Sequence, residues 1–284
     1  MKSGESLREG FKHYLNNPVL ILPYLLFGLF SLFLYNFSIN FARESFSILK
    51  ITSPFQILLL QEEFADTLSA IILRNVFFFI LVGIIYALVD SFVKAYTIGL
   101  SEKISRTGGA KLKDGFQGAT QTLQIFGKNI ILILLLLFGF GLLLLTTAIL
   151  LAQFALLAFI PAAIIYAFII YSVSFFASQS IVVEKKGPWG GIVSSYAFIK
   201  RNMEDVAKLI LFILFVYVAF HVIRLASLRL FEHFFVGATM RLISVAENLL
   251  LGYIIMRPYF VILKTLYFIK NQRFILVKAK EKMR

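Results

Sequence analysis

An uninterrupted apolar run from Asn129 to Val183 constrains the fold more than any other feature of the sequence. It contains 55 residues. A helix rises 1.5 Å per residue and needs only about 20 residues to cross a hydrocarbon core of roughly 30 Å. The chain must therefore reverse within the run, and we expect the reversal near Gln153, the strongly polar side chain in its middle. The run predicts two membrane spans joined in a tight hairpin.

Four further apolar runs predict four more spans. Hydrophobic residues make up 60% of the chain, charged residues make up 15%, and the mean hydropathy is +0.86. A water-soluble domain contains roughly 45–50% apolar and 25% charged residues, so this chain needs lipid as its solvent. We predict an all-α integral membrane six-helix bundle formed by a single transmembrane domain, residues 1–284. The predicted spans are residues 19–40, 71–100, 129–152, 154–183, 207–228 and 242–269.

The basic residues predict the orientation of these spans, because Lys and Arg are retained on the cytoplasmic face. Six spans put both termini on one side. Of the 28 Lys and Arg residues, six fall on the opposite side: Arg43, Lys50, Arg74, Arg224, Arg229 and Arg241. The others, with Lys128 assigned to the second connection and Lys264 to the C-terminal segment, predict cytoplasmic N- and C-termini in the cell (plasma) membrane. This distribution explains the net charge of +13 without a nucleic-acid partner.

Three short amphipathic segments precede the odd-numbered spans, at residues 5–16, 111–127 and 189–201. Each has apolar residues at helical spacing on one face and basic or polar residues on the other. We predict three cytoplasmic interfacial helices, so that one unit of amphipathic helix and transmembrane hairpin recurs three times. A basic tail, residues 270–284, follows the last span.

Helices of this kind lie in the membrane interface, with apolar side chains in the acyl boundary and basic side chains at anionic head groups. The candidate lipid contacts are Lys12, Lys111, Lys113, Trp189, Lys200 and Arg201. A structural alternative stays open, in which each helix is an elbow that positions the next span.

Ionisable residues inside the spans form a second group of candidates, because charges in a membrane are costly and usually paired. We predict a pair of Asp90 with Arg257 or Lys94 near the inner face. A second pair, Arg224 with Glu247, is predicted near the outer face, with His221 at similar depth. These residues either hold the spans together or line a polar pathway or head-group site.

The stretch IVVEKKGPWGGIVSSYAFIKRNMEDVAKL, from Ile181 to Leu209, carries a resemblance to a known family. A span ends in Val-Glu, a Gly turn follows, and an amphipathic helix ends in a basic residue and Asn. This pattern resembles a prokaryotic, archaeal-like family of multi-pass membrane proteins related to the membrane domain of glycerophosphoryl diester phosphodiesterases. The resemblance implies the membrane architecture but no activity, because the family's catalytic domain has no counterpart in this sequence.

Sequence motifs of catalysis and cofactor binding are absent. No P-loop, dinucleotide fingerprint, zinc-protease or nucleophile-elbow motif occurs. The acidic residues Glu62, Glu63 and Asp66 read as a solvated face, so we expect no metal, no cofactor and no enzyme activity. The leading hypothesis is a non-enzymatic membrane or envelope component that associates with lipid, with a protein partner or with copies of itself. The alternative is a transporter or the permease subunit of a transport complex.

Overall fold

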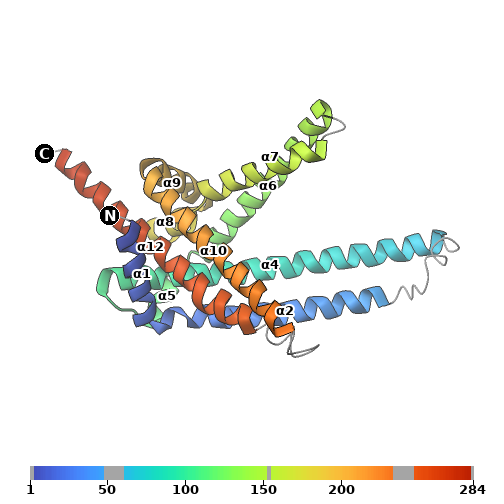
Figure 1. The fold of residues 1–284 in the computed structure, drawn as a ribbon, viewed down its shortest axis with the longest axis horizontal. Helices are drawn as coiled ribbons and strands as arrows, with labels where there is room; N and C mark the ends of the chain where they lie inside the picture. The colour runs from blue at the N-terminus through green and yellow to red at the C-terminus, as the bar shows by residue number, and fades with distance from the viewer. Residues whose placement is uncertain (1–2, 48–60, 152–154, 233–245, 283–284) are drawn as a thin grey trace. The chain divides into compact units, whose positions relative to one another are not determined.

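The computed structural model describes residues 3–47, 61–151, 155–232 and 246–282, and within these ranges the chain is helical with no strand (Figure 1). The prediction of an all-α fold is confirmed. The main helices are η1 (Pro18–Leu20), α2 (Leu22–Ser47), α4 (Gln61–Thr107), α6 (Thr122–Leu151), α7 (Ala155–Val173), α8 (Ala177–Glu184), α10 (Met203–Glu232), η3 (Asn248–Met256) and α12 (Arg257–Lys282).

Six stretches of described helix are long and apolar enough to cross a membrane, which makes the chain a multi-pass membrane protein. They are Pro18–Phe41, Leu73–Thr107, Thr122–Ile149, Ala158–Glu184, Met203–Ser227 and Gly252–Gln272. Each overlaps one predicted span. The predicted reversal at Gln153 lies outside the described residues.

The chain forms two compact units, a smaller one of residues 26–90 and a larger one of residues 1–25 and 91–284. In the smaller unit α2 runs antiparallel to the first part of α4. The Phe27 ring lies 5.2 Å from that of Tyr86, while Phe41 stacks on Phe78 at 3.7 Å. Aromatic contacts therefore link these two helices at both ends of the unit.

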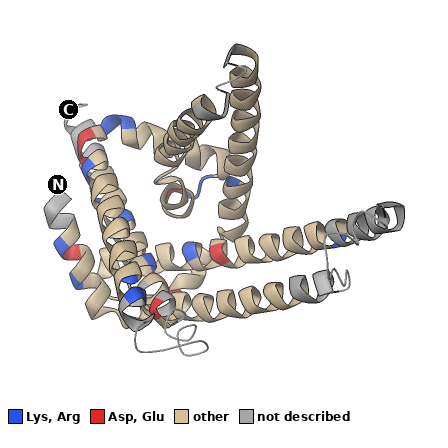
Figure 2. Cartoon of the chain, turned by 45° about the vertical axis from the view of Figure 1, so that its right-hand side comes forward, with Lys and Arg blue, Asp and Glu red and all other residues tan. Residues whose placement is uncertain are grey.

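Helices α6 and α7 of the larger unit also form an antiparallel pair. The Tyr166 hydroxyl on α7 donates a hydrogen bond to the carbonyl of Leu135 on α6 at 2.7 Å. The Phe140 ring meets those of Phe159 and Tyr166 edge to face. Gly139 leaves space for the Tyr166 ring, which a Cβ atom at this position would meet. Figure 2 shows this pair almost free of charged residues, with Lys128 the exception in α6.

The predicted fourth span, residues 154–183, is broken by a turn at residues 174–176 between α7 and α8. A helix break releases backbone groups that need new partners. The Ser195 hydroxyl is the partner of two such groups. It donates a hydrogen bond to the Val173 carbonyl at 2.7 Å and accepts one from the Phe176 N–H at 3.0 Å. Ser195 belongs to α9 (Pro188–Arg201), so the break is fixed by the following amphipathic helix.

The sixth span changes its helical pitch shortly before Pro258. Residues Asn248–Met256 form the π-helix η3, and Pro258 lies in the first turn of α12, where a missing N–H is tolerated. Helix α12 then continues to Lys282, so the first part of the predicted basic tail is helical.

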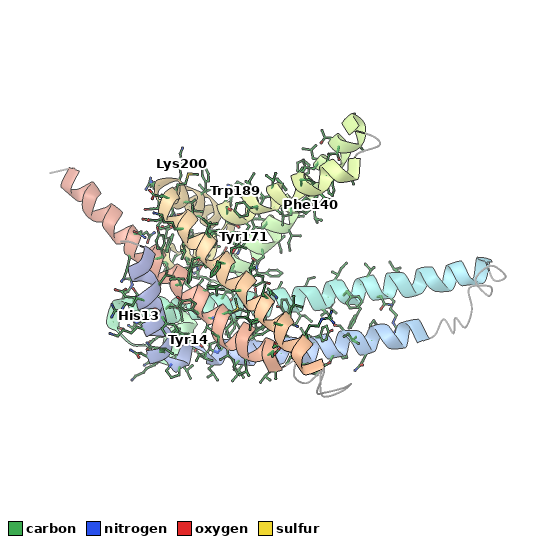
Figure 3. The ribbon with its side chains drawn as sticks, viewed as in Figure 1. His13, Tyr14, Phe140, Tyr171, Trp189 and Lys200 are labelled. Carbon is green, nitrogen blue, oxygen red and sulfur yellow. The ribbon has the colours of Figure 1, made fainter. Side chains whose placement is uncertain are left out.

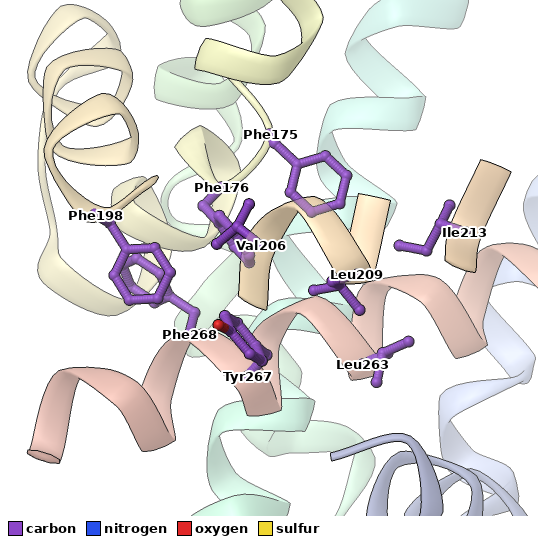
Figure 4. Packing of buried hydrophobic residues seen from close by; sticks show 9 residues of the cluster. All are labelled: Phe175, Phe176, Phe198, Val206, Leu209, Ile213, Leu263, Tyr267 and Phe268. Atoms are coloured by element: carbon purple, nitrogen blue, oxygen red, sulfur yellow. The ribbon is translucent and has the colours of Figure 1, made fainter. Parts of the chain in front are cut away.

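The core of the larger unit lies around α12 (Figure 4). It consists of buried side chains from α9, α10, α12 and the turn before α8: Phe175, Phe176, Phe198, Val206, Leu209, Ile213, Leu263, Tyr267 and Phe268. The Phe176 ring lies 4.9 Å from that of Phe198 and stacks on Tyr267 at 5.8 Å. Aromatic packing thus joins helices that are distant in sequence.

Three short helices lie at the predicted interfacial positions: α1 (Ser3–Asn16), α5 (Leu112–Ala119) and α9. The middle one is shorter than predicted. Residues 122–127 form the beginning of α6, and the α5 helix ends before them.

Candidate functional site: three amphipathic helices and the intramembrane charges

Helix α9 divides its apolar residues between two edges. Ile192 and Phe198 are buried in the larger unit beside Ser195, whose hydroxyl holds the preceding helix break. Trp189 is 59% exposed, and Val193 and Tyr196 are exposed with it. Lys200 and Arg201 are exposed at the end of the helix, and Figure 3 labels Trp189 and Lys200.

Helix α5 packs on α4 through two glycines. A Cβ atom at Gly118 would lie 2.8 Å from the Cα of Gly99 and would also meet the Ala95 carbonyl, so glycine is needed for this close approach. The other edge of α5 exposes Phe116, at 59%, together with Leu112.

The predicted lipid contacts of α5 are its first two lysines, and both are exposed. Lys111 is the N-cap residue, and its backbone N–H donates to the Asp114 carboxylate at 2.8 Å. Lys113 lies within the first turn of the helix. The two ammonium groups therefore stand beside the exposed apolar edge of α5.

Helix α1 packs through Tyr14, which is buried and donates from its hydroxyl to the Ile254 carbonyl of η3 at 2.8 Å. Phe11, at 54%, and Leu15 are exposed on another edge, and Lys12 is exposed near them. Helix α1 thus repeats the arrangement of α5 and α9, with one edge against the protein and an apolar edge outside.

The polar edge of α1 lines a pocket of about 450 Å³ with residues from α4 and α12. Its lining residues are Glu9, Lys12, His13, Asn16, Asn17, Ser105, Gly108 and Lys270. Glu9 and Lys270 form an ion pair in it. Partial burial, and then the charge of Lys12, lower the pKa of His13.

The sequence predicts one apolar face for each amphipathic helix, and the structure divides that face into two. The inner edge is buried in the protein, which fixes the helix. The outer edge keeps exposed aromatic or aliphatic side chains beside lysine or arginine. This pairing of apolar and cationic groups is the one that binds an anionic membrane surface.

The predicted inner charges lie on two helices. Asp90 and Lys94 are one turn apart on α4, both half-buried, and neither is without a partner. Arg257 begins α12 and its guanidinium lies 4.3 Å from the centre of the Tyr253 ring. Asp90 belongs to the smaller unit and Arg257 to the larger, so their pairing stays a prediction.

Of the predicted outer charges, Glu247 is bound to α10 by a serine. The Ser227 hydroxyl on α10 lies 2.7 Å from the Glu247 carboxylate and 2.9 Å from the Arg224 carbonyl. Glu247 is therefore held against α10 one turn from Arg224, while the predicted ion pair of these two residues stays a prediction. The His221 ring, six residues before Ser227, lies 4.4 Å from that of Tyr217 on the same helix.

Lys128 and Lys264, which were counted with the basic residues of the connections, lie in helices that span the membrane. Lys128 on α6 is 7% exposed, and its ammonium donates to the Ser178 hydroxyl at 3.1 Å. Its neighbour Asn129 donates to Ser91 on α4 at 3.1 Å. Lys264 lies in the middle of α12, in the span that ends at Gln272. The sequence signal for Lys128 and Lys264 was their position directly before or within an apolar run.

Sequence reasoning also missed the polar network around Glu184, at the end of α8. Its carboxylate accepts from the hydroxyl of Ser194 at 2.6 Å and pairs with the Lys186 ammonium at 2.9 Å. It also accepts from Ser180 and from the Gln272 amide on α12. The Val-Glu segment of the resemblance thus joins α8, α9 and α12 in a structural link.

Comparisons of the chain with protein-family models, with curated proteins and with solved structures gave no match. Within the described residues, no three His, Cys, Asp or Glu side chains gather where they could hold a metal ion.

Proposed function

We propose that this protein is a non-enzymatic membrane component that binds anionic lipid through the exposed edges of α1, α5 and α9. The observation that supports it is the shared layout of these helices. Each is anchored to the protein along one edge, and each exposes apolar side chains beside lysine or arginine on another. An anchored helix loses little conformational entropy when it binds, which favours a permanent contact with the interface.

The proposed setting is the plasma membrane of a prokaryote, with both termini in the cytoplasm. The distribution of Lys and Arg over the connections supports this orientation. In it, the basic ends of the amphipathic helices face the leaflet that carries the anionic lipids. The proposed relation to the membrane domain of glycerophosphoryl diester phosphodiesterases is supported by the order span, Val-Glu, Gly turn and amphipathic helix between Ile181 and Leu209.

The experiment uses Trp189, the single tryptophan of the chain, as a reporter of α9. The full-length protein is reconstituted into vesicles of neutral phosphatidylcholine that contain a small fraction of brominated lipid. The brominated lipid is either phosphatidylglycerol or phosphatidylcholine. We expect Trp189 fluorescence to be quenched more by brominated phosphatidylglycerol, because the anionic lipid gathers around Lys200 and Arg201.

The combined variant Lys200→Gln and Arg201→Gln should remove this preference while leaving quenching by the neutral lipid unchanged. Lys208→Gln is the control, because this exposed ammonium already pairs with Glu204 at 2.6 Å. Equal quenching by both lipids in the natural sequence, or an anionic preference that survives the combined variant, would contradict the proposal.

A transporter, or the permease subunit of a transport complex, is the second candidate. The interrupted helices favour it, since the break between α7 and α8 and the π-helix η3 are the kind of irregularity found at membrane binding sites. Replacing Asp90 and Arg257 with neutral residues should then abolish solute flux in vesicles without unfolding the protein. Flux that survives these substitutions would leave the two charges a structural role.

A further inference from the structure

Lys264 places an ammonium group inside a membrane span among aromatic rings. Its Nζ atom lies 3.9 Å from the centre of the Phe175 ring and 5.9 Å from that of Tyr171. Contact of this kind stabilises a cation, but by less than the cost of placing a charge in a bilayer. The aromatic rings therefore hold Lys264 without neutralising it.

The charges around Lys264 do not supply a counter-ion. Among the residues that the structure describes, no carboxylate lies within ion-pair distance of its ammonium. A cation in a low-dielectric region attracts an anion strongly, so the Lys264 ammonium on the Phe175 ring creates a site for an anion.

An exposed apolar stripe on α7 leads to this site. Ile160, Ile164, Phe168 and Tyr171 follow one another at steps of four, four and three, which places them on one face of the helix. Ile164 is 64% exposed, Phe168 54% and Tyr171 50%. The Tyr171 ring at the end of the stripe lies 5.8 Å from that of Phe175, which is buried in the turn after α7 and carries the Lys264 ammonium on its face (Figure 3 labels Tyr171).

We propose that this face of α7 and α12 is a binding site for one anionic phospholipid, with its phosphate at Lys264 and an acyl chain along the α7 stripe. Charge complementarity selects the anionic head group, and the stripe selects a lipid over a small soluble anion. The site rests on the proposed association with anionic lipid, but it lies within a span and does not involve the exposed edges of α1, α5 and α9.

The test measures thermal unfolding of the full-length protein in a neutral detergent with three additives in separate titrations. These are short-chain phosphatidylglycerol, phosphatidylcholine of the same chain length, and inorganic phosphate. A ligand that binds the folded and not the unfolded state raises the unfolding temperature, and the rise grows with the ratio of its concentration to its Kd. We expect a rise with phosphatidylglycerol, and none with phosphatidylcholine or inorganic phosphate at the same concentration.

Lys264→Met should make the apparent affinity for phosphatidylglycerol roughly tenfold weaker, the loss expected for one charge-assisted contact. Lys264→Arg should keep the affinity, because it keeps the positive charge. Phe168→Ala, in the exposed stripe, should weaken binding by a smaller factor and serves as a second probe should Lys264→Met not fold. Lys208→Gln is the control and should bind as the natural sequence does.

Unchanged phosphatidylglycerol affinity in Lys264→Met, or in Phe168→Ala if only that variant folds, would overturn the proposal. An equal rise with inorganic phosphate would overturn it too, because the ligand would then be a soluble anion. The combined Lys200 and Arg201 variant separates the two proposals. If that variant still shows the rise in unfolding temperature with phosphatidylglycerol, the Lys264 site is supported, even when Trp189 shows no preference for the anionic lipid.

Discussion

Helix α12 and the α6–α7 pair cross the membrane in different surroundings. Half of the spanning window of α12 is buried inside the protein, compared with 6% for α6 and 11% for the span that contains α7. Their sequences differ in the same way, because α12 mixes Lys, Thr, Asn and Gln with its apolar residues, while the α6–α7 pair is almost entirely apolar. Polar side chains are accepted where the protein can supply partners, and the lipid-exposed helices have to do without them.

The largest expected change in unfolding free energy comes from a substitution in the aromatic core of the larger unit. Phe176→Ala removes a fully buried ring that contacts Phe198, Tyr267 and Phe268, so we expect a loss of about 3 to 5 kcal/mol of unfolding free energy. The matched variant Phe138→Ala removes a ring that is 73% exposed on α6 and should cost less than about 0.5 kcal/mol. Equilibrium unfolding in mixed detergent micelles measures both. Equal losses would remove the distinction between the two regions.

A smaller effect is expected at the glycine contact of α4 and α5. Gly118→Ala places a methyl group against backbone atoms of Ala95 and Gly99, which cannot move independently of their helix, and we expect a loss of about 1 to 3 kcal/mol. Gly141→Ala on α6 is the control, because nothing lies within 4 Å of the added Cβ. It should leave the same unfolding free energy unchanged or slightly raised. A neutral Gly118→Ala would show that α5 is not packed as closely as described.

The next smaller loss of unfolding free energy is expected at Ser195, the serine that bonds both sides of the break between α7 and α8. Ser195→Ala leaves the Phe176 N–H and the Val173 carbonyl without their side-chain partner, at a cost of roughly 1 to 2 kcal/mol. Thr147→Ala on α6 removes a hydroxyl that donates to the Leu143 carbonyl of its own helix, 2.9 Å away. That carbonyl already serves the helix backbone, so Thr147→Ala should change the unfolding free energy by less than about 0.5 kcal/mol. A more damaging Thr147→Ala would reverse this ranking.

The smallest effect is the pH dependence that His13 gives to the α1 contact. Its pKa is lowered in the folded protein from the ordinary value of 6.5, by partial burial first and by Lys12 second. The unfolded chain therefore binds the proton more readily. The contribution of His13 to the free energy of unfolding is fully present above pH 6.5, and it is lost as the pH drops through the lowered pKa.

Unfolding midpoints at pH 7.5 and 5.5 measure this dependence. His13→Gln should reduce the difference between the two midpoints, whereas the Glu9–Lys270 pair in the same pocket is present in both proteins. An unchanged difference would assign the pH dependence to other groups.

The spans could be predicted from the sequence because length and hydropathy alone decide whether a helix can cross a bilayer. The amphipathic helices could be found because a period of 3.6 residues is a local property. The sequence placed Lys128 directly before the predicted span 129–152 and Lys264 inside the span 242–269, but it gave neither side chain a partner. Their partners, Ser178 and the Phe175 ring, are distant in sequence and known only from tertiary packing. The same holds for Ser195, whose bonds to Val173 and Phe176 depend on where α9 packs.

The π-helix η3 sets the rotational phase of the last span. An α-helix turns 100° per residue, and a π-helical segment accommodates one residue more than α-helical pitch would allow. If the same residues between Glu247 and Arg257 adopted α-helical pitch, the extra residue would turn α12 by about 100° relative to Glu247. Glu247 could then stay on Ser227 only if Leu263 and Tyr267 left the core. The wide turn thus lets one helix satisfy two contacts that an ordinary helix of the same sequence would present out of phase.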